Sequence, residues 1–501
     1  MSAGVDPRTP CIIGVAQHTV RPPGPSPEPL ELWEQRAREA AADSASTAGA
    51  AGVLERLDSV QVVYCQTWPY DDPVGRLLER IGADPKDRHY SGIGGTTPQV
   101  LLNGLAERIL ASELELGLVV GAEALATTRA LKKAGERAAW SHRDPEKKPF
   151  PFEAVPPKTE VAHQVFQAYL TFPLFDTARR AARGASLGDY ADATAQMFTR
   201  MTEVAAANPH AWFPKVRSAA ELGTATPENR YVGWPYTKYE VSVMDVDMSA
   251  AAIIASEATA DALGVPVEKR VYPLGWAYAT DVWTVAERDD MARSDGMKAV
   301  ADAVLGMAGV GIDDIAAFDL YSCFASSLHL QCDAMGLDPL DPRGLTVTGG
   351  LPFAGGPASN YMLHSIATMV DRLRAEPGSK GMVTGVGMHM TKHCNAVYSS
   401  APPSSVPVPI DKEALQAGLD AGPKRAVLAA HEGPATVVAY TVEHGRDGAP
   451  MSGLLILEVD GGGRCYARVN DPALLSDAES RELVGQAVTV STDGSVNTAT
   501  W

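Results

Sequence analysis

Short apolar runs alternate with helical patterns through the first part of the chain. Strands are predicted at residues 11–20, 60–65 and 116–125, which are rich in β-branched or small apolar residues and bounded by turn signals. Helices are predicted at 30–48, which is rich in Ala and Glu, and at 97–110, where Leu and Ile recur at helical spacing. Strands that alternate with helices are typical of a parallel sheet whose faces are covered by helices.

The same order of elements returns in the second part of the chain. A strand at 271–279, a helix at 294–309 and a strand at 316–323 precede a glycine turn with a helix at 351–373 and a last strand at 379–387. In both copies a pair of glycines precedes a proline, a helix and an apolar strand that ends in glycine. We interpret this as an internal duplication of a βαβαβ-type half. Both helix N-termini are then expected at the carboxyl ends of the strands, where ligands of open α/β sheets bind.

The segment between the two copies, residues 126–240, breaks this alternation. It contains a basic stretch, a proline-rich stretch, helices and the aromatic loop NRYVGWPYTKYE. Loops this long are usually functional. We therefore expect an insertion that folds over one end of the sheet as a lid or binding surface.

The composition changes again after residue 401. Residues 402–410 are a linker rich in Pro and Ser, and residues 411–422 predict one short helix. Four strands follow, and two of their connections, GRDGAP and GGG, have hairpin composition. These strands predict a small antiparallel barrel of OB type. The expected domains are an N-terminal half (1–125), the insertion (126–240), a C-terminal half (241–401), the linker (402–410) and the OB-like β domain (411–501).

Charge and cysteine content narrow the class of protein. The formal net charge of -18 argues against a nucleic-acid or anionic-membrane surface, so an anionic ligand needs a local basic patch. No apolar run approaches the roughly 20 residues of a membrane span, and the N-terminus has no signal-peptide pattern. The six cysteines lack metal-ligand spacing. We therefore expect no metal site and a reducing, cytoplasmic location.

The turn from Gly92 to Thr97 leads directly into the helix at 97–110. A glycine-rich turn at a helix N-terminus exposes backbone N–H groups at the positive end of the helix dipole, so it attracts an anion or stabilises a thiolate. The turn contains no thiol. The alternative is a tight turn that only lets a buried helix approach a strand.

From about residue 9 to residue 400, the duplicated halves and the insertion resemble the thiolase superfamily. The family's nucleophile motif, Cys-x-Ser-Gly followed by Gln, corresponds to GGTT at 94–97 with Gln99. Its Asn-Glu-Ala-Phe motif, which is His-Asp-Cys-Phe in sterol carrier-type thiolases, corresponds to YSCF at 321–324. Its Gly-His-Pro motif corresponds to GGP at 355–357, and its Cys-x-Gly motif to GVG at 385–387. The resemblance implies a duplicated five-layer αβαβα fold.

The departures from these motifs concern the residues that do the family's chemistry. Thiolases use a Cys thiolate to accept the acyl group, a His to activate it, and a second Cys to move a proton. Here the nucleophile position is Gly94, the His position Gly356 and the second Cys position Gly385, while Tyr321 replaces the Asn or His. Glycine has no side chain that can attack, donate or accept. The resemblance therefore implies that thiolase (Claisen) activity is lost.

The ligand that the resemblance implies is coenzyme A or an acyl-CoA thioester, with no covalent cofactor. The pantetheine arm is expected under the insertion, with the nucleotide phosphates near its basic residues. The glycine turns at two helix N-termini still offer N–H donors to a thioester or carboxylate oxygen. We thus expect a protein of lipid metabolism that binds or delivers acyl-CoA. The candidate binding residues are Gly95, Thr96, Tyr321, Ser322, Gly355, Gly356, His389, Arg179 and Arg183.

An active CoA-dependent acyltransferase or thioesterase is the alternative function. Its candidate catalytic residues are Cys323, His389 and His393; the two histidines follow the last predicted strand together with Lys392. Each also has a structural interpretation, as a buried apolar thiol or a structural histidine. A third hypothesis is that the protein is a purely structural subunit. The chain is expected to be a homodimer or a monomer, with a lipid-pathway protein as a further candidate partner, because some thiolase-like proteins work with separate OB-fold proteins.

Overall fold

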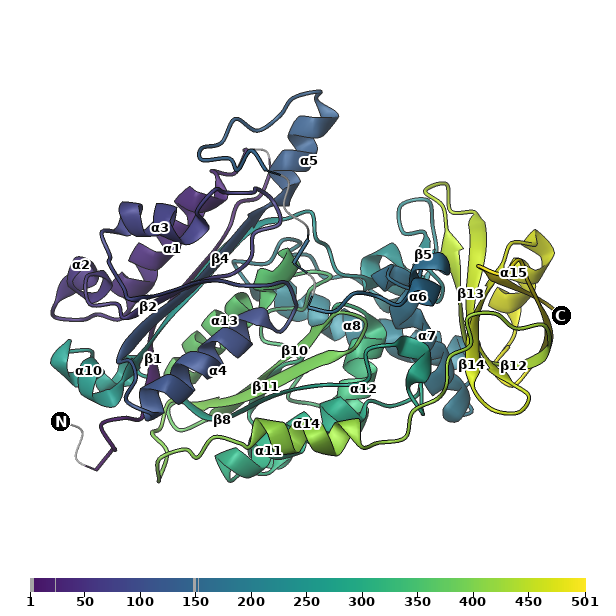
Figure 1. Ribbon diagram of the computed structural model, residues 1–501. Helices are drawn as coiled ribbons and strands as arrows, with labels where there is room; N and C mark the ends of the chain where they lie inside the picture. The colour runs from purple at the N-terminus through teal and green to yellow at the C-terminus, as the bar shows by residue number, and fades with distance from the viewer. Residues whose placement is uncertain (1–3, 23, 147–149, 152) are drawn as a thin grey trace.

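Helices and two stacked sheets form alternating layers in the computed structural model of the protein (Figure 1). The structure describes residues 4–22, 24–146, 150–151 and 153–501. Helices α1 and α3 cover the outer face of the first sheet, α4 and α13 lie between the sheets, and α11 covers the outer face of the second. This confirms the five-layer αβαβα fold. The bounds of these helices are α1 Pro29–Asp43, α3 Pro73–Ile81, α4 Thr97–Leu110, α11 Asp295–Ala308 and α13 Tyr361–Ala375.

The first sheet has the strand order β1-β7-β4-β2-β3. Strand β2 is parallel to β3 and β4, whereas β7 is antiparallel to both β1 and β4. Strand β7 follows the insertion in the sequence, so the expected boundary at residue 240 separates it from the sheet to which it belongs. Its alanine-rich stretch is buried along its whole length, which lets α1 and α13 pack closely on its two faces. The strands are β1 Pro10–Thr19, β2 Ser59–Val62, β3 Asp87–Tyr90, β4 Leu116–Ala124 and β7 Asp247–Ser256.

The second sheet has the strand order β8-β11-β10-β9 and contains a strand that the sequence pattern missed. Strand β11, with the sequence KHCNAVYS, runs antiparallel to β8 and β10 and is buried throughout. Its polar first half does not have the apolar run expected of a central strand. The sequence pattern therefore places residues 392 and 393 after the last strand rather than within one. The strands are β8 Tyr272–Thr280, β9 Ala317–Asp319, β10 Lys380–Gly387 and β11 Lys392–Ser399.

The insertion is mainly helical and ends in a short hairpin, β5–β6, that leaves the body. Residue Gly233 of β5 pairs with Glu443 of β12, so the hairpin extends the sheet of the C-terminal barrel. Helix α7 packs on the same strand, and the Thr177 hydroxyl donates a hydrogen bond to the Tyr440 carbonyl at 3.0 Å. The elements are α6 Lys158–Ala162, α7 Ala168–Ala182, α8 Leu187–Ala207, α9 Ala219–Gly223, β5 Tyr231–Gly233 and β6 Tyr236–Thr237.

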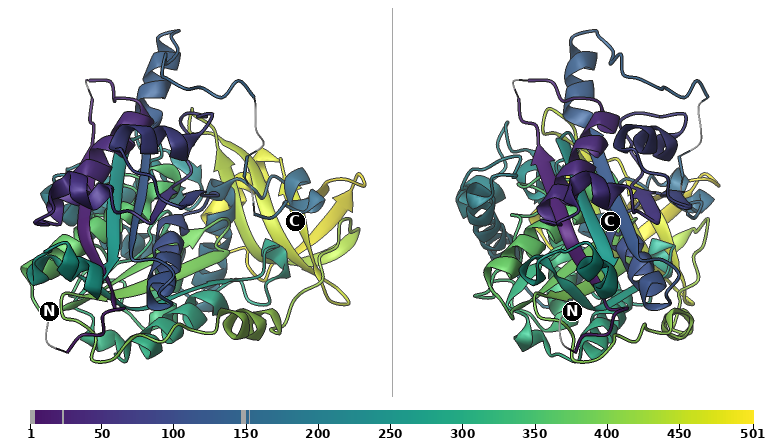
Figure 2. Two further views of the ribbon diagram at one scale, coloured as in Figure 1. Left: turned by 60° about the vertical axis from the view of Figure 1, so that its left-hand side comes forward. Right: turned by 90° about the vertical axis from the view of Figure 1, so that its left-hand side faces the viewer.

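The C-terminal strands close into a barrel at one end of the body, as the left view of Figure 2 shows in yellow. The order β12-β13-β14-β16-β15-β12, with β14 and β16 parallel, is that of a five-stranded OB-type barrel. Four strands were predicted; β16 and the helix α15 between β14 and β15 were missed. The elements are β12 Gly433–His444, β13 Pro450–Val459, β14 Arg464–Val469, α15 Pro472–Ser480, β15 Ala487–Thr492 and β16 Asn497–Thr500.

The predicted helix after the linker is α14, Lys412–Asp420, and it belongs to the body rather than to the barrel. It packs on β8 and α11, and the Gln416 side chain bonds the backbone of Thr280 in both directions.

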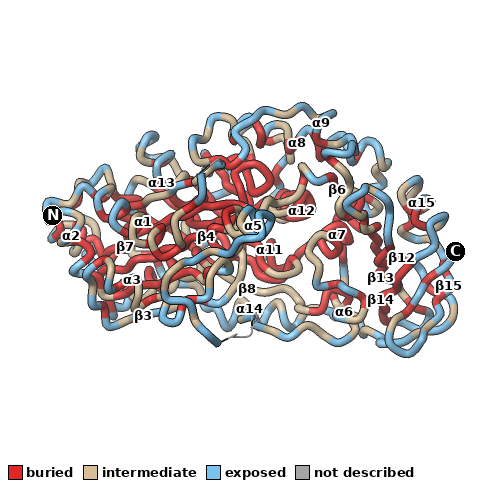
Figure 3. Tube along the Cα trace, turned by 90° about the horizontal axis from the view of Figure 1, so that it is seen from above, coloured by how far each residue is buried: buried red, intermediate tan, exposed pale blue. Residues whose placement is uncertain are grey.

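Buried residues run without interruption through the layered body, and the barrel interior has a second apolar cluster (Figure 3). Trp234 of the insertion belongs to that second cluster, so the insertion and the barrel share a core. Among the described residues, no helix has the length and apolar character needed to cross a membrane.

Candidate functional site

The glycine turn before α4 lines a pocket with a volume of about 360 Å³. The turn joins β3 to α4, and the Thr97 N–H donates to the Gly94 carbonyl at 3.1 Å, which closes the turn. The Thr97 N–H is used by this bond and Pro98 has no N–H, so the donors that the turn can offer a ligand are the N–H groups of Gly95 and Thr96. The pocket is lined by residues of the turn together with Leu101, Tyr278, Glu153 and Lys392.

Lys392 is the charged group that faces the nucleophile position. Its side chain is only 6% exposed and forms an ion pair with Glu153, and its Nζ donates to the Ile93 carbonyl at 3.4 Å. A Cβ built on Gly94 lies 3.6 Å from this Nζ. The N–H of Gly94 donates to the Ser359 hydroxyl at 3.1 Å. A side chain at Gly94 would therefore lie in ordinary contact with the Thr96 and Thr97 hydroxyls, beside the Lys392 ammonium group.

The other two glycine motif positions are filled by neighbouring side chains. A Cβ on Gly356 would collide with the Ser242 hydroxyl, and one on Gly385 would collide with the Met362 sulfur and lie 2.7 Å from the Cys394 sulfur. Real Cβ atoms do not approach other heavy atoms this closely. An imidazole or a thiol therefore has no room at these positions without a shift of the surrounding chain.

The second glycine turn is held by the protein itself. Gly355 has φ of +106°, and a Cβ there would lie 2.6 Å from the Met248 sulfur, so only glycine fits. The N–H of Gly356 donates to the Val243 carbonyl at 2.8 Å. Of the two turns expected to offer donors to a ligand, the one before α4 lines the pocket of about 360 Å³, whereas Gly356 of this turn donates to the protein itself.

Tyr321 and Ser322 are buried at the end of β9. The Tyr321 hydroxyl contacts Gly95 so closely that a Cβ on Gly95 would overlap it. Burial raises the pKa of Tyr321 far above its ordinary value, so the phenol stays protonated. The Ser322 hydroxyl accepts the Leu351 N–H at 3.0 Å and thereby fixes the loop that carries Gly355.

The three candidate catalytic residues of the alternative function lie in separate environments. His389 Nε2 is 3.1 Å from the Phe166 carbonyl oxygen, and burial lowers the pKa of His389. His393 Nε2 is 3.0 Å from Asp281 Oδ2, toward α11. Because side chains alternate along a strand, His393 faces away from Lys392. Burial raises the pKa of Cys323 to about 12, so it is a thiol at neutral pH. Among the described residues, no hydrogen bond joins any two of the three.

Cys394 is not among the candidates that the sequence suggests, although it lies beside Gly385. It is fully buried on β11, opposite Gly385, with its sulfur 3.8 Å from the Thr96 carbonyl and 3.5 Å from the Met362 sulfur. Burial raises the pKa of this thiol well above its usual range. Knowledge that residues 392–399 form a strand would have located both Cys394 and Lys392.

Arg179 and Arg183 are already paired with an acidic residue. The Arg179 guanidinium binds both carboxylate oxygens of Asp333, at 2.6 and 2.8 Å, and Arg183 binds one of them at 2.5 Å. Asp333 belongs to α12, Ala325–Met335. These bonds join the insertion to the second half of the body, and they occupy the basic groups that were expected near the nucleotide phosphates.

Comparison with known proteins shows the family to which the chain belongs. Residues 414–495 match the family model described as the thiolase-like protein type 1 additional C-terminal domain. The crystal structure of a monomeric SCP2-thiolase-like protein type 1 from Mycobacterium smegmatis is 33% identical and aligns with a TM-score of 0.86, covering 99% of this chain and 100% of that chain. No curated protein sequence matches the chain.

More distant structures share the fold of the body alone. The acetyl-CoA acetyltransferase of Syntrophomonas wolfei is 13% identical with a TM-score of 0.56, over 78% of this chain and 99% of its own. Human mitochondrial 3-ketoacyl-CoA thiolase, solved in complex with CoA, is 14% identical with a TM-score of 0.55, over 80% of this chain and 100% of its own. The full-length relative, with its matching barrel, assigns the chain more narrowly: it belongs to the type 1 SCP2-thiolase-like proteins, which carry an additional C-terminal domain.

Proposed function

We propose that this protein binds CoA thioesters at the glycine turn before α4 and releases them without thiolase chemistry. The observation that carries the proposal is the pocket of about 360 Å³ in which the α4 N-terminus and the Lys392 ammonium face the same space. This volume lies within the usual range for small-molecule sites. Backbone N–H groups and a buried ammonium are suited to hold a thioester oxygen or an anionic group of the ligand.

The residues at and around the motif glycines support the absence of a covalent step. Gly94 offers no nucleophile, and Ser242, Met362 and Cys394 occupy the space beside the other motif glycines. The two nearest thiols, Cys323 and Cys394, have raised pKa values and so lack the thiolate form that attacks a thioester. The role proposed for the protein in lipid metabolism is therefore to hold or deliver an acyl-CoA.

Incubation with acetyl-CoA and acetoacetyl-CoA tests this function. We expect a calorimetric binding signal, no release of free CoA thiol, and no acyl adduct in the mass spectrum of the intact protein. Thiol release or an adduct would contradict the non-catalytic role and favour the thioesterase or acyltransferase. If neither CoA nor its thioesters gave a binding signal, the ligand assignment itself would be wrong.

Replacing Lys392 with glutamine is expected to weaken binding of acetyl-CoA about tenfold, because a charge-assisted hydrogen bond contributes on the order of 1.5 kcal/mol. The matched control is Lys298→Gln, which removes the same charge from an exposed site on α11 where Lys298 pairs with Asp302. Calorimetric titration of both variants gives the comparison. Equal affinities in the two variants would place the ligand elsewhere.

The proposed assembly is a monomer in the cytoplasm, as the SCP2-thiolase-like relative is described as monomeric. In this proposal the fused barrel has the role that a separate OB-fold protein has in related lipid-pathway systems. Light scattering after size exclusion measures the mass directly, and a dimer mass would overturn the monomer.

A further inference from the structure

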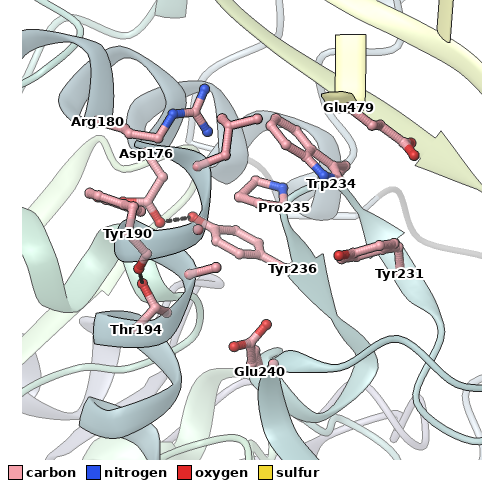
Figure 4. A pocket seen from close by; sticks show the side chains of 14 residues that line it. Asp176, Arg180, Tyr190, Thr194, Tyr231, Trp234, Pro235, Tyr236, Glu240 and Glu479 are labelled. Carbon is pink, nitrogen blue, oxygen red and sulfur yellow. Dashed lines mark hydrogen bonds between the residues drawn. The ribbon is translucent and has the colours of Figure 1, made fainter. Parts of the chain in front are cut away.

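A second pocket, of about 220 Å³, lies between the insertion and the barrel (Figure 4). It is bounded by α7 and α8 on one side, by the β5–β6 hairpin on another and by Glu479 of α15 at its rim. Three aromatic side chains of the hairpin, Tyr231, Trp234 and Tyr236, supply most of its ring surface. This is the aromatic loop that the sequence marked as a binding surface, and the glycine-turn site makes no use of it.

The base of this pocket holds the buried carboxyl group of Glu240, which uses one of its two oxygens in hydrogen bonds with the described residues. Glu240 is 3% exposed, and its Oε2 accepts the Thr237 N–H at 3.0 Å and the Thr237 hydroxyl at 3.1 Å. Among the described residues, none donates to Oε1, and Figure 4 shows the carboxylate directed into the pocket. Oε1 remains accessible from the pocket, so a ligand that enters can donate a hydrogen bond to it.

The other charged groups of the pocket do not supply that donor. Asp176 accepts hydrogen bonds from Tyr190 at 2.7 Å and Tyr236 at 2.5 Å, and it also pairs with His329. The Arg180 guanidinium stacks over Trp234 and is paired with Glu482 at 3.0 Å, so its positive charge is matched. The free space therefore combines π faces with a carboxyl group that has no basic partner among the described residues.

We propose that this pocket binds a small alkylammonium ion, with its nitrogen on Glu240 Oε1 and its alkyl group against Tyr231 and Trp234. The ring faces give the alkyl group an apolar surface on which to pack, and an ammonium ion within about 6 Å of a ring face is also attracted to it. A carboxylate in the same cavity accepts an ammonium N–H and adds a charge-assisted bond. The volume of about 220 Å³ admits only a small ligand, because drug-sized sites are larger. The proposal is independent of CoA binding at α4, because no residue lines both pockets.

Binding should release a proton from Glu240. Burial raises the pKa of Glu240 to about 8, so near pH 7 the empty pocket holds it mostly protonated. A bound cation favours the charged form, so net proton release is expected on binding at pH 7. Affinity should then rise between pH 6 and pH 8. The other titratable groups that line the pocket are Asp176, Arg180, Tyr190, Tyr231, Tyr236 and Glu479, which is bonded to His444.

Calorimetry of the full-length protein with n-butylammonium chloride tests the site, with n-butanol as the neutral counterpart. We expect saturable binding of the ammonium ion, no heat with the alcohol, and proton release measured in two buffers of different ionisation enthalpy. Glu240→Gln should weaken binding about tenfold or more and abolish the proton release. Tyr231→Leu should weaken binding about fivefold while keeping the release.

Two controls keep the result interpretable. The glutamine of Glu240→Gln retains a carbonyl oxygen for the Thr237 N–H, so the local cap is preserved, and the melting temperature checks it. Glu203→Gln removes the same charge from an exposed site on α8 and should leave binding unchanged. Equal binding of n-butanol, unchanged affinity in Glu240→Gln, or no heat with the ammonium ion at millimolar concentration would each overturn the proposal.

Discussion

Replacing Asp319 with alanine is expected to lower the free energy of unfolding by about 4 kcal/mol, because it leaves a group of buried donors without an acceptor. Asp319 is 0% exposed at the end of β9. Its Oδ1 accepts the Thr346 hydroxyl at 2.7 Å and the Thr348 hydroxyl at 2.9 Å, as well as two backbone N–H groups of the same loop. Its Oδ2 accepts the Tyr361 hydroxyl at 3.1 Å and the Ser365 hydroxyl.

This carboxylate joins β9 and α13 to the loop that leads to Gly355. Chemical denaturation followed by circular dichroism measures the loss. Asp302→Ala is the control, since Asp302 is exposed on α11 and pairs with Lys298 one helical turn away; a change below about 0.5 kcal/mol is expected there. Similar losses in both variants would show that the Asp319 network contributes little to stability.

Gly95→Ala is expected to destabilise the protein by about 3 kcal/mol, because the added methyl has no space. A Cβ on Gly95 would overlap both the Val386 carbonyl oxygen and the Tyr321 hydroxyl. The carbonyl belongs to the backbone of β10 and cannot turn aside. For that reason the further change Tyr321→Phe should not restore stability.

Gly104→Ala is the matched control in the same segment. A Cβ on Gly104 meets nothing within 4 Å, and the residue lies inside α4. Alanine favours the helix over glycine, so this variant should gain about 0.5–1 kcal/mol. The two variants thus differ in sign as well as size, and denaturation midpoints measured side by side distinguish them. A neutral Gly95→Ala would mean that β10 and α4 can separate at little cost.

The layered body was predictable because its signals are local and repeated. The paired glycines at 94–95 and 355–356, each followed by a proline and a helix, identified the duplication. Strand β11 escaped because a strand buried on both faces is normally an apolar run, whereas β11 begins with Lys, His, Cys and Asn. Those polar residues are satisfied by partners from distant segments, such as Asp281 for His393, that no local pattern reveals.

The candidate site was predictable in part for the same reason. The resemblance located the glycines at the motif positions, and the turn before α4 lines a pocket as expected. What fills the space beside those glycines comes from elsewhere in the chain: Ser242 from the segment just after the insertion and Met362 from α13. Arg179 and Asp333 are 154 positions apart in the sequence. Their pairing, which engages the arginine, could therefore be seen only in the folded structure.

The strand pairing that places Gly233 opposite Glu443 has a consequence for how the chain moves. One continuous sheet crosses from the insertion into the barrel. The barrel therefore cannot rotate about a hinge where β5 meets β12. A chain shortened before β12 would leave a naked strand edge and the indole of Trp234 facing water, a combination that invites self-association. The barrel therefore buries surfaces that the rest of the chain would otherwise expose. A longer linker before the barrel would not let it move independently of the body.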